Sequence, residues 1–357
     1  MAAYRLAPLA VLLLIAVVSL SARAALAQGS PPDRTLPPGE TSAPDQSAAN
    51  PLDAVIGLRA LIPADARTAG SLGTERQGSG VVIDAEQGLV LTIGYLVMEA
   101  GSVELLLPDD RVVGAEVTAY DYDSGFGLLR ADRPLGLPAM PLGDSLTEAE
   151  ERSEVLVVAS TGRQQRVAPA VVVSRRDFTG YWEYLLADAI FTTPPAPGYG
   201  GAALVSREGE LLGIGSLQVG DALGGNGSLG GRVLPGNMFV PIQTLRPIYN
   251  DLLTFGRANT APRPWLGLHT VEVGDRLLVQ RVTPDGPADR AGIEPLDVVV
   301  AVDRETVSDQ ADFYRKIWAL GDAGVEVPLT VLRADMRRDA ELRSIDRYDF
   351  LRLDGSF

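Results

Sequence analysis

Cysteine is absent from this chain of 357 residues, and histidine occurs only once, as His269. Without cysteine there can be no disulfide, no thiol nucleophile and no thiolate metal site. A single histidine also excludes zinc sites built on two or three imidazoles. Lysine is equally rare, since Lys316 is the only one in the sequence. We therefore predict neither a metal site nor a cofactor.

Basic residues are also fewer than acidic residues. The sequence has 31 Lys+Arg residues against 46 Asp+Glu residues, which gives a formal net charge of −15 and a pI of about 4.6. Such a field repels a phosphate backbone, so nucleic acid is not an expected partner. Hydrophobic residues make up 46% of the chain and charged residues 22%, as in soluble globular proteins. The length allows two domains with separate cores.

The one long apolar run lies at the N-terminus. Arg5 precedes an apolar stretch over residues 9–20, and residues 25–27 (Ala-Leu-Ala) have the small-residue pattern of a cleavage site. Residues 1–27 therefore indicate a signal peptide, and we expect export to the periplasm. An uncleaved anchor is the alternative, but the run is shorter than the roughly 20 residues of a spanning helix, so no permanent membrane span is expected. Residues 28–51 are rich in Pro, Ser, Gly and Asp, which predicts a disordered linker.

Short β-rich runs separated by turn residues fill residues 52–256. Many short strands with turn signals between them predict an all-β sandwich or barrel. We expect one helix in this domain, over residues 241–255, where apolar residues recur at helical spacing and end before Gly256.

A polar linker at residues 257–263 leads to a second small domain, which we place at residues 264–347. Three apolar runs in it predict strands, and apolar residues at helical spacing predict a helix over residues 309–320. The tail, residues 348–357, has no pattern that assigns it.

Five stretches of the first domain resemble motifs of trypsin-like serine proteases of the HtrA/Deg family, in the same order and at similar spacing. They are residues 78–84, 88–97, 125–130, 197–205 and 236–242. In the register of that resemblance the catalytic histidine falls on Tyr95, the aspartate on Gly125 and the serine on Gly200. The resemblance implies a mainly β fold with a chymotrypsin-like double β-barrel.

The residues at these three positions cannot perform the chemistry of the triad. Serine hydrolysis needs a hydroxyl, a base to take its proton and a carboxylate to orient the base. Tyrosine, with an ordinary pKa of about 10, is a poor base near neutrality, and glycine has no side chain. Because His269 lies in the second domain, the first domain holds no Ser–His pair. We therefore predict no catalytic residue, and hence a pseudoprotease rather than an enzyme.

Other catalytic schemes are the alternative. A Ser–Lys dyad would need Lys316, which falls on the helix of the second domain. Asp123-Ser124-Gly125 matches the Asp-Thr/Ser-Gly of aspartic proteases, although a solvated turn explains it better. Prolines at residues 192–198 predict a reshaped loop before the nucleophile position, in which backbone donors can persist. A serine-type endopeptidase, or another hydrolase with an unrecognised set of residues, is the enzyme alternative.

The second domain resembles a PDZ domain of the HtrA type. The motif covers residues 264–268, 282–293 and 296–302, with Leu296 in place of the usual glycine. By that resemblance, successive backbone N–H groups would bind a C-terminal carboxylate, and the peptide would add as a strand. The loop would be formed by Trp265, Leu266, Gly267 and Leu268.

The remaining residues of the predicted peptide site are His269, Phe313 and Ile317. His269 is expected to be a half-exposed strand residue that tunes peptide choice between pH 5 and 8. Phe313 and Ile317 would line the pocket for the last peptide side chain, but core packing of the helix explains them equally well.

Together these features predict a periplasmic HtrA-like protein that binds peptides or protein C-termini through its PDZ domain. It would act as an adaptor, as a regulator of active HtrA-type relatives or as a holdase in the cell envelope. A structural scaffold with an idle PDZ groove is a further alternative. The resemblance also implies a homo-oligomer, as a trimer.

Overall fold

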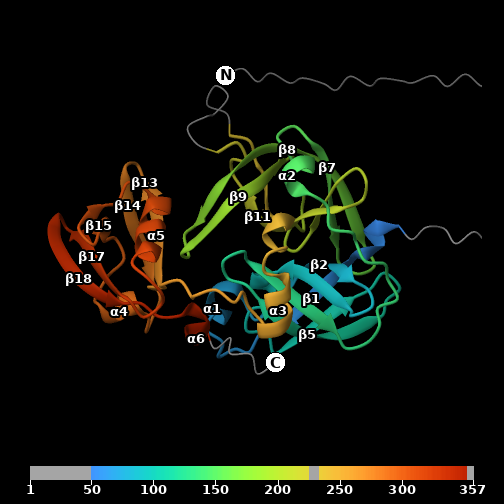
Figure 1. The fold of residues 1–357 in the computed structure, drawn as a ribbon, viewed down its shortest axis with the longest axis horizontal. Coiled ribbons are helices and arrows are strands. Elements are labelled where there is room, and N and C mark those ends of the chain that lie inside the picture. Colours follow the sequence, from blue (N-terminus) through green and yellow to red (C-terminus); the bar gives the residue numbers. More distant parts are fainter. Residues whose placement is uncertain (1–49, 225–232, 352–357) are drawn as a thin grey trace, which may run out of the picture. The chain divides into compact units, whose positions relative to one another are not determined.

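The computed structural model describes residues 50–224 and 233–351 (Figure 1). The predicted signal peptide at residues 1–27 and nearly all of the predicted linker at residues 28–51 lie outside the described residues. No helix in the described part of the chain has the length and apolar character that crossing a membrane requires.

The first six strands close into an antiparallel barrel in the order β1-β2-β3-β6-β5-β4. Most of their buried hydrophobic side chains are aliphatic, which suits the pleated inner surface of a barrel. The strands are β1 (Val55–Leu61), β2 (Glu75–Asp84), β3 (Leu89–Ile93), β4 (Ser102–Leu106), β5 (Val112–Tyr120) and β6 (Phe126–Ala131). Three short helices accompany them: η1 (Pro51–Ala54), α1 (Ala69–Leu72) and η2 (Gly94–Leu96).

The next six strands form a second closed barrel in the order β10-β11-β12-β9-β8-β7. They are β7 (Glu154–Ser160), β8 (Gln165–Gly180), β9 (Tyr184–Thr193), β10 (Ala203–Val205), β11 (Leu211–Val219) and β12 (Gly236–Pro241), preceded by α2 (Ser145–Glu148). The β8–β9 hairpin pairs as far as Gly180 opposite Tyr184, so residues 181–183 form its turn. This turn reaches the C-terminal domain, as described below.

The predicted helix over residues 241–255 is wrong as one continuous element. The segment forms η3 (Ile242–Thr244) and, after a turn, α3 (Tyr249–Phe255). Pro247 lies between them, and proline has no backbone N–H to bond a preceding carbonyl and disfavours helical geometry in the residue before it. The predicted end is confirmed, because Gly256 caps α3 in the left-handed conformation.

The C-terminal domain is a sheet in the order β13-β14-β15-β17-β18, with β16 paired to β15. Its strands are β13 (Leu268–Val273), β14 (Arg276–Val282), β15 (Val298–Val302), β16 (Glu305–Thr306), β17 (Glu326–Arg333) and β18 (Met336–Arg343). The helices are α4 (Pro287–Arg290), α5 (Gln310–Ala319) and α6 (Arg347–Leu351). Helix α5 confirms the predicted helix, and the Asp309 carboxylate caps it by accepting from the N–H of Asp312 at 2.8 Å.

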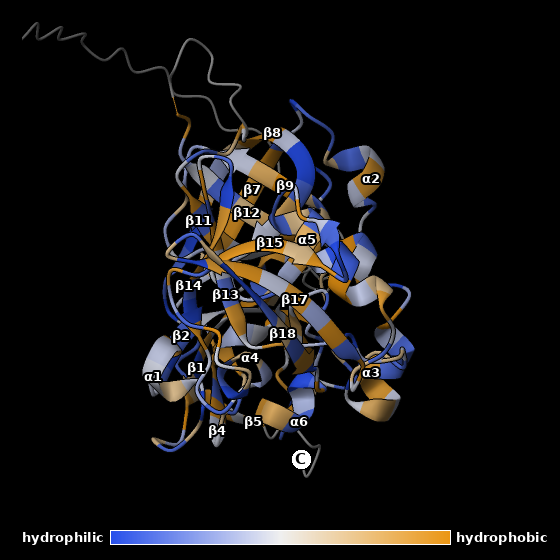
Figure 2. Cartoon of the chain, turned by 90° about the vertical axis from the view of Figure 1, so that its left-hand side faces the viewer, coloured by the Kyte–Doolittle hydropathy of each residue, from blue (hydrophilic) through white to orange (hydrophobic). Residues whose placement is uncertain are grey.

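Separate apolar cores lie under the barrels and under the C-terminal sheet. Figure 2 shows hydrophobic colour along strands such as β15 and β17, whose inward side chains are buried. The prediction of a mainly β fold with a double barrel followed by a small C-terminal domain is confirmed.

Candidate functional site

The three positions predicted to replace a catalytic triad lie close together. Tyr95 is in η2 and Gly125 directly precedes β6, both in the first barrel, whereas Gly200 precedes β10 of the second. A Cβ atom on Gly200 would lie 2.7 Å from the hydroxyl oxygen of Tyr95. The backbone N–H of Gly94 donates to the carbonyl of Gly125 at 2.7 Å. The structure therefore brings together the positions that the resemblance pairs.

Tyr95 fills the space beside Gly200. Its hydroxyl donates to the carbonyl oxygen of Ser216 at 3.0 Å, which holds the ring in place. Burial raises the pKa of Tyr95 above its ordinary value of about 10, so the phenol stays neutral near pH 7. Tyr95 is therefore a packed, hydrogen-bonded phenol.

The backbone of the loop around Gly200 is held tightly against the first barrel. The N–H of Ser79 donates to the carbonyl of Gly200 at 2.9 Å. Gly201 has a φ of 73°, and a Cβ atom there would lie 1.9 Å from the carbonyl oxygen of Ser79, so only glycine fits. Within the described chain the N–H groups of Gly198 and Gly200 donate to no acceptor, which leaves two backbone donors for the oxygen of a ligand.

A second arrangement involves the predicted carboxylate-binding loop, residues 265–268. The side chain of Glu183, from the β8–β9 turn, occupies it. One carboxylate oxygen accepts from the N–H of Leu266 at 3.0 Å, and the other accepts from the N–H of Leu268 at 2.7 Å. The N–H of Gly267 also contributes to holding this carboxylate. The loop therefore binds a carboxylate within the chain itself.

The backbone of the same turn lies along the edge strand β13 as an added peptide would. The N–H of Thr270 donates to the carbonyl oxygen of Tyr181 at 3.0 Å. The hydroxyl of Tyr314, on α5, donates to the carbonyl of Gly180 at 2.8 Å. A carboxylate in the loop together with a carbonyl on the edge strand is the arrangement of strand addition.

Burial dominates the electrostatics of Glu183. The residue is only 6% exposed, and it forms no ion pair with the described residues. Burial raises the pKa of Glu183 to about 7, although the N–H groups of Leu266, Leu268 and Gly267 favour the charged form. The buried carboxyl is therefore protonated more readily than that of an exposed glutamate.

The other predicted peptide-site residues occupy different environments. Trp265 packs on Phe350, with ring centroids 4.6 Å apart. His269 lies partly buried on β13, where its ring contacts the side chains of Thr283 and Arg281. Phe313 and Ile317 are buried in the core of the C-terminal domain, with exposures of 0% and 1%. A pocket for a peptide side chain beside them stays a prediction.

The sequence analysis did not single out Glu183, Tyr181 or Tyr314. Glu183 lies in a polar hairpin turn, which ordinarily faces solvent. Its only local signal is conformational, because a φ of 58° is unusual for a residue other than glycine. That signal is visible in the structure but not in the sequence.

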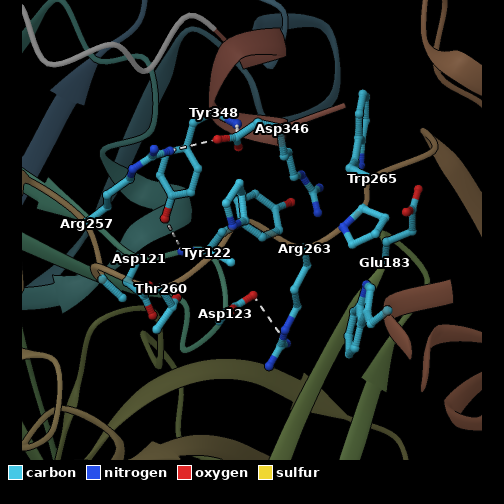
Figure 3. Close-up of a pocket in the computed structure, with 16 residues that line it drawn as sticks. Asp121, Tyr122, Asp123, Glu183, Arg257, Thr260, Arg263, Trp265, Asp346 and Tyr348 are labelled. Atoms are coloured by element: carbon cyan, nitrogen blue, oxygen red, sulfur yellow. Dashed lines mark hydrogen bonds and ion pairs between the residues drawn. The ribbon is translucent and has the colours of Figure 1, made fainter. Parts of the chain in front are cut away.

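Beneath the loop lies a narrow polar crevice of about 50 Å³ (Figure 3). Trp265 and Glu183 lie on one side of it, and Tyr348 and Asp346 on another. The Asp123 carboxylate pairs with the guanidinium of Arg263 at 3.3 Å, while the Asp121 carboxylate accepts from the N–H and hydroxyl of Ser124, so neither carboxyl hydrogen-bonds the other as in an aspartic-protease site. The crevice is too small for a peptide or an organic cofactor.

Comparisons with known proteins agree with this architecture. Residues 78–214 match the trypsin-like peptidase domain family, and residues 264–343 match the PDZ domain family. The solved structure of the HtrA-type protease AlgW with a decapeptide has a TM-score of 0.50 and 22% sequence identity, and the match covers 84% of this chain and 96% of that one. At that identity the likeness bears on the fold alone.

Among the relatives are bacterial and plant proteins named as proteases. The chain is 27% identical over 283 residues to a Haemophilus influenzae protein named "Probable periplasmic serine protease do/HhoA-like", covering 74% of this chain and 57% of the relative. It is 26% identical over 272 residues to the periplasmic serine endoprotease DegP of Salmonella typhimurium, covering 72% and 54%. The chain thus spans little more than half the length of these two relatives.

These relatives contradict the prediction that the chain is not an enzyme. Each is named as a serine protease or endoprotease, so the comparisons relate this chain to proteins named as enzymes and do not support a prediction of no enzyme. The prediction rested on side chains at three positions, and such substitutions do not by themselves define the activity of a family. The chain combines a trypsin-like peptidase domain with one PDZ domain and is a homologue of the HtrA/DegP serine proteases.

Proposed function

We propose that this protein binds the C-termini of polypeptide chains at its PDZ loop, residues 265–268, in the periplasm. The observation that carries the proposal is the Glu183 carboxylate, held by the N–H groups of Leu266 and Leu268 at 3.0 Å and 2.7 Å. A chain terminus offers the same carboxylate and, in addition, a backbone that can pair with β13. The periplasmic names of the relatives support the location.

In this proposal Glu183 and the incoming C-terminus compete for one set of donors. The turn at residues 181–183 must leave β13 before a peptide adds there, because the N–H of Thr270 already donates to the carbonyl of Tyr181. The apparent affinity for a peptide is then lowered by the fraction of molecules in which the turn is docked. A client with a free carboxylate and an extended C-terminal segment opens the site.

The roles that fit this binding are those of an adaptor, a regulator of HtrA-type relatives or a holdase for exported chains. Each of these roles requires reversible binding of polypeptide C-termini. Self-association of this chain, as a trimer, would place several such loops in one assembly and raise the avidity for a client.

The test is a fluorescence-anisotropy titration of the full chain with labelled peptides that have free or amidated C-termini. We expect the free form of a binding peptide to bind at least tenfold more tightly than its amidated form, because only a carboxylate satisfies the charge-assisted bonds. Glu183→Ala should tighten binding about tenfold by removing the competitor. Glu151→Ala, at an exposed glutamate away from the loop, is the matched control. Equal binding of free and amidated peptides would refute the proposal.

A second candidate function is peptide-bond hydrolysis by the barrels, which the names of the relatives favour. Tyr95, Gly125 and Gly200 offer no nucleophile, imidazole or carboxylate, so such a reaction would have to use other residues. The backbone donors of Gly198 and Gly200 could still bind the carbonyl oxygen. Hydrolysis would be supported by two results together: a casein-degrading activity that co-purifies with the chain, and stoichiometric labelling of the chain by a fluorophosphonate probe.

A further inference from the structure

A larger cavity, of about 490 Å³, lies where the first barrel, the β8–β9 turn and the PDZ domain meet. Its volume falls within the roughly 300–1,000 Å³ of sites that enclose small organic ligands. Aromatic side chains from all three parts line it, among them Tyr95, Trp182, Tyr199 and Phe350. The walls therefore offer ring faces together with hydroxyl groups, including those of Thr68, Ser216 and Thr283.

The charge of this cavity is opposite to that of the whole chain. Three arginines line it, Arg67, Arg281 and Arg347, and none of the described residues that line it is Asp or Glu. This occurs in a chain with a formal net charge of −15. None of the three guanidinium groups forms an ion pair with any described residue, unlike Arg59, Arg257 and Arg333. A cationic cavity in an acidic protein selects for anions.

Arg347 is the most deeply placed of the three. Its guanidinium stacks over the ring of Tyr122 at 3.3 Å from the centroid, and Nη1 donates to the carbonyl oxygen of Trp182 at 2.8 Å. Its Nε is buried and has no acceptor among the described residues. Burial lowers the pKa of Arg347 to about 9, so the group is still charged at neutral pH. This is a buried cation without a counterion in the described chain.

Arg281 and Arg67 are more exposed and lie at other parts of the cavity. The Nη2 atom of Arg281 lies 2.9 Å from Nε2 of His269. Burial and the neighbouring Arg281 lower the pKa of His269 to about 4, so the imidazole is neutral and accepts this bond. Arg67 lies over the ring of Phe350 at 4.0 Å. Ring faces thus orient the guanidinium groups of Arg67 and Arg347, and Nε of Arg347 has no acceptor among the described residues.

We propose that this cavity binds a small amphipathic anion, namely a free organic acid whose aromatic or aliphatic body packs on the rings while its single carboxylate pairs with the arginines. A polypeptide segment is the competing ligand, and the displacement experiment below distinguishes the two. The carboxylate of this ligand lies at a different place from the C-terminal carboxylate of the proposed function, since Glu183 does not line this cavity, although Trp265, His269 and Tyr181 border both sites.

The test compares two probes that share one aromatic framework. The anion 8-anilinonaphthalene-1-sulfonate and the uncharged N-phenyl-1-naphthylamine are each titrated into the full chain, and fluorescence reports binding. We expect one saturable site for the anion, with at least tenfold tighter binding than for the uncharged probe. Decanoate should displace the anion, and decanamide, which has the same chain without charge, should not.

Variants assign the charge selection to particular residues. Arg281→Gln and Arg67→Gln should each weaken binding of the anionic probe about tenfold and leave the uncharged probe unchanged. Arg166→Gln, at an exposed arginine of β8 outside the cavity, is the control and should change neither. Circular dichroism checks that the variants are folded.

Three results would overturn the inference. Equal affinity for the two probes would mean that the cavity does not select charge. Unchanged binding of the anion by Arg281→Gln and Arg67→Gln would place the probe elsewhere. Displacement by peptides with free C-termini, but not by decanoate, would assign the cavity to the peptide ligand instead.

Discussion

The loop at residues 198–200 between the barrels and the PDZ loop at residues 265–268 both present backbone N–H groups, and they differ in what those groups bind. In the first loop the N–H groups of Gly198 and Gly200 donate to no acceptor among the described residues, and the predicted triad positions Tyr95, Gly125 and Gly200 offer no imidazole or carboxylate. In the PDZ loop only backbone N–H groups are required, and they hold the carboxylate of Glu183.

The two sites differ because backbone donors and catalytic side chains place different requirements on the sequence. Backbone donors are positioned by φ and ψ and persist as long as the fold and its glycines persist. A catalytic triad depends on three side chains, and a single substitution removes one of its functions. Carboxylate binding is therefore the more robust of the two properties in this fold.

The largest effect is expected from breaking the backbone frame of the PDZ loop. Gly267 has a φ of 80°, whereas proline is fixed near −65° and has no N–H to donate. Gly267→Pro should therefore weaken binding of C-terminal peptides by at least 100-fold, measured by fluorescence anisotropy. Gly267→Ala keeps the N–H and should lose less, although its Cβ would lie 3.2 Å from Cβ of Thr283. Unchanged peptide binding by the proline variant would show that this loop is not part of the binding site.

Sequence motifs were sufficient to place the barrels, the PDZ domain and the register of Tyr95 with Gly200, because local patterns carry that information. They could not indicate Glu183, whose contacts join residues 83 and 85 positions apart in the sequence. A glutamate in a hairpin turn looks like a solvated polar residue until the tertiary fold buries it. The break at Pro247 is different, since proline within the helical pattern was a readable signal.

An intermediate effect is expected from pH, through Glu183. The pKa of the docked carboxyl is about 7, above the ordinary value of about 4.3 for a free glutamate. Between these values the docked state binds more protons than the released state, so raising the pH through this window favours release. Peptide affinity of the native chain should therefore rise by roughly 10- to 100-fold between pH 5 and pH 8.

Glu183→Gln serves as the control for this pH dependence and should show a flat profile over the same range. The neighbouring groups do not titrate there. Burial lowers the pKa of His269 to about 4, that of Arg347 is lowered only to about 9, and burial raises the pKa of Tyr314 above its ordinary range. An unchanged pH dependence in the glutamine variant would exclude Glu183 as its source.

The smallest effect is expected from the contact between Tyr95 and Gly200, and it is measured as a coupling free energy between substitutions at the two positions. A Cβ atom on Gly200 would lie 2.7 Å from the hydroxyl oxygen of Tyr95, so Gly200→Ala should lower the free energy of unfolding by about 1–3 kcal/mol. In a Tyr95→Phe background that oxygen is gone, and the same substitution should cost about 1 kcal/mol less. Chemical denaturation of the four proteins gives the coupling.

Gly198→Ala, in the same loop but with its Cβ 3.6 Å from Cβ of Ala159, should show no coupling to Tyr95→Phe. If the unfolding free-energy changes of Gly200→Ala and Tyr95→Phe are additive, the two residues do not contact each other. The alignment of these positions with a protease triad would then lose its support.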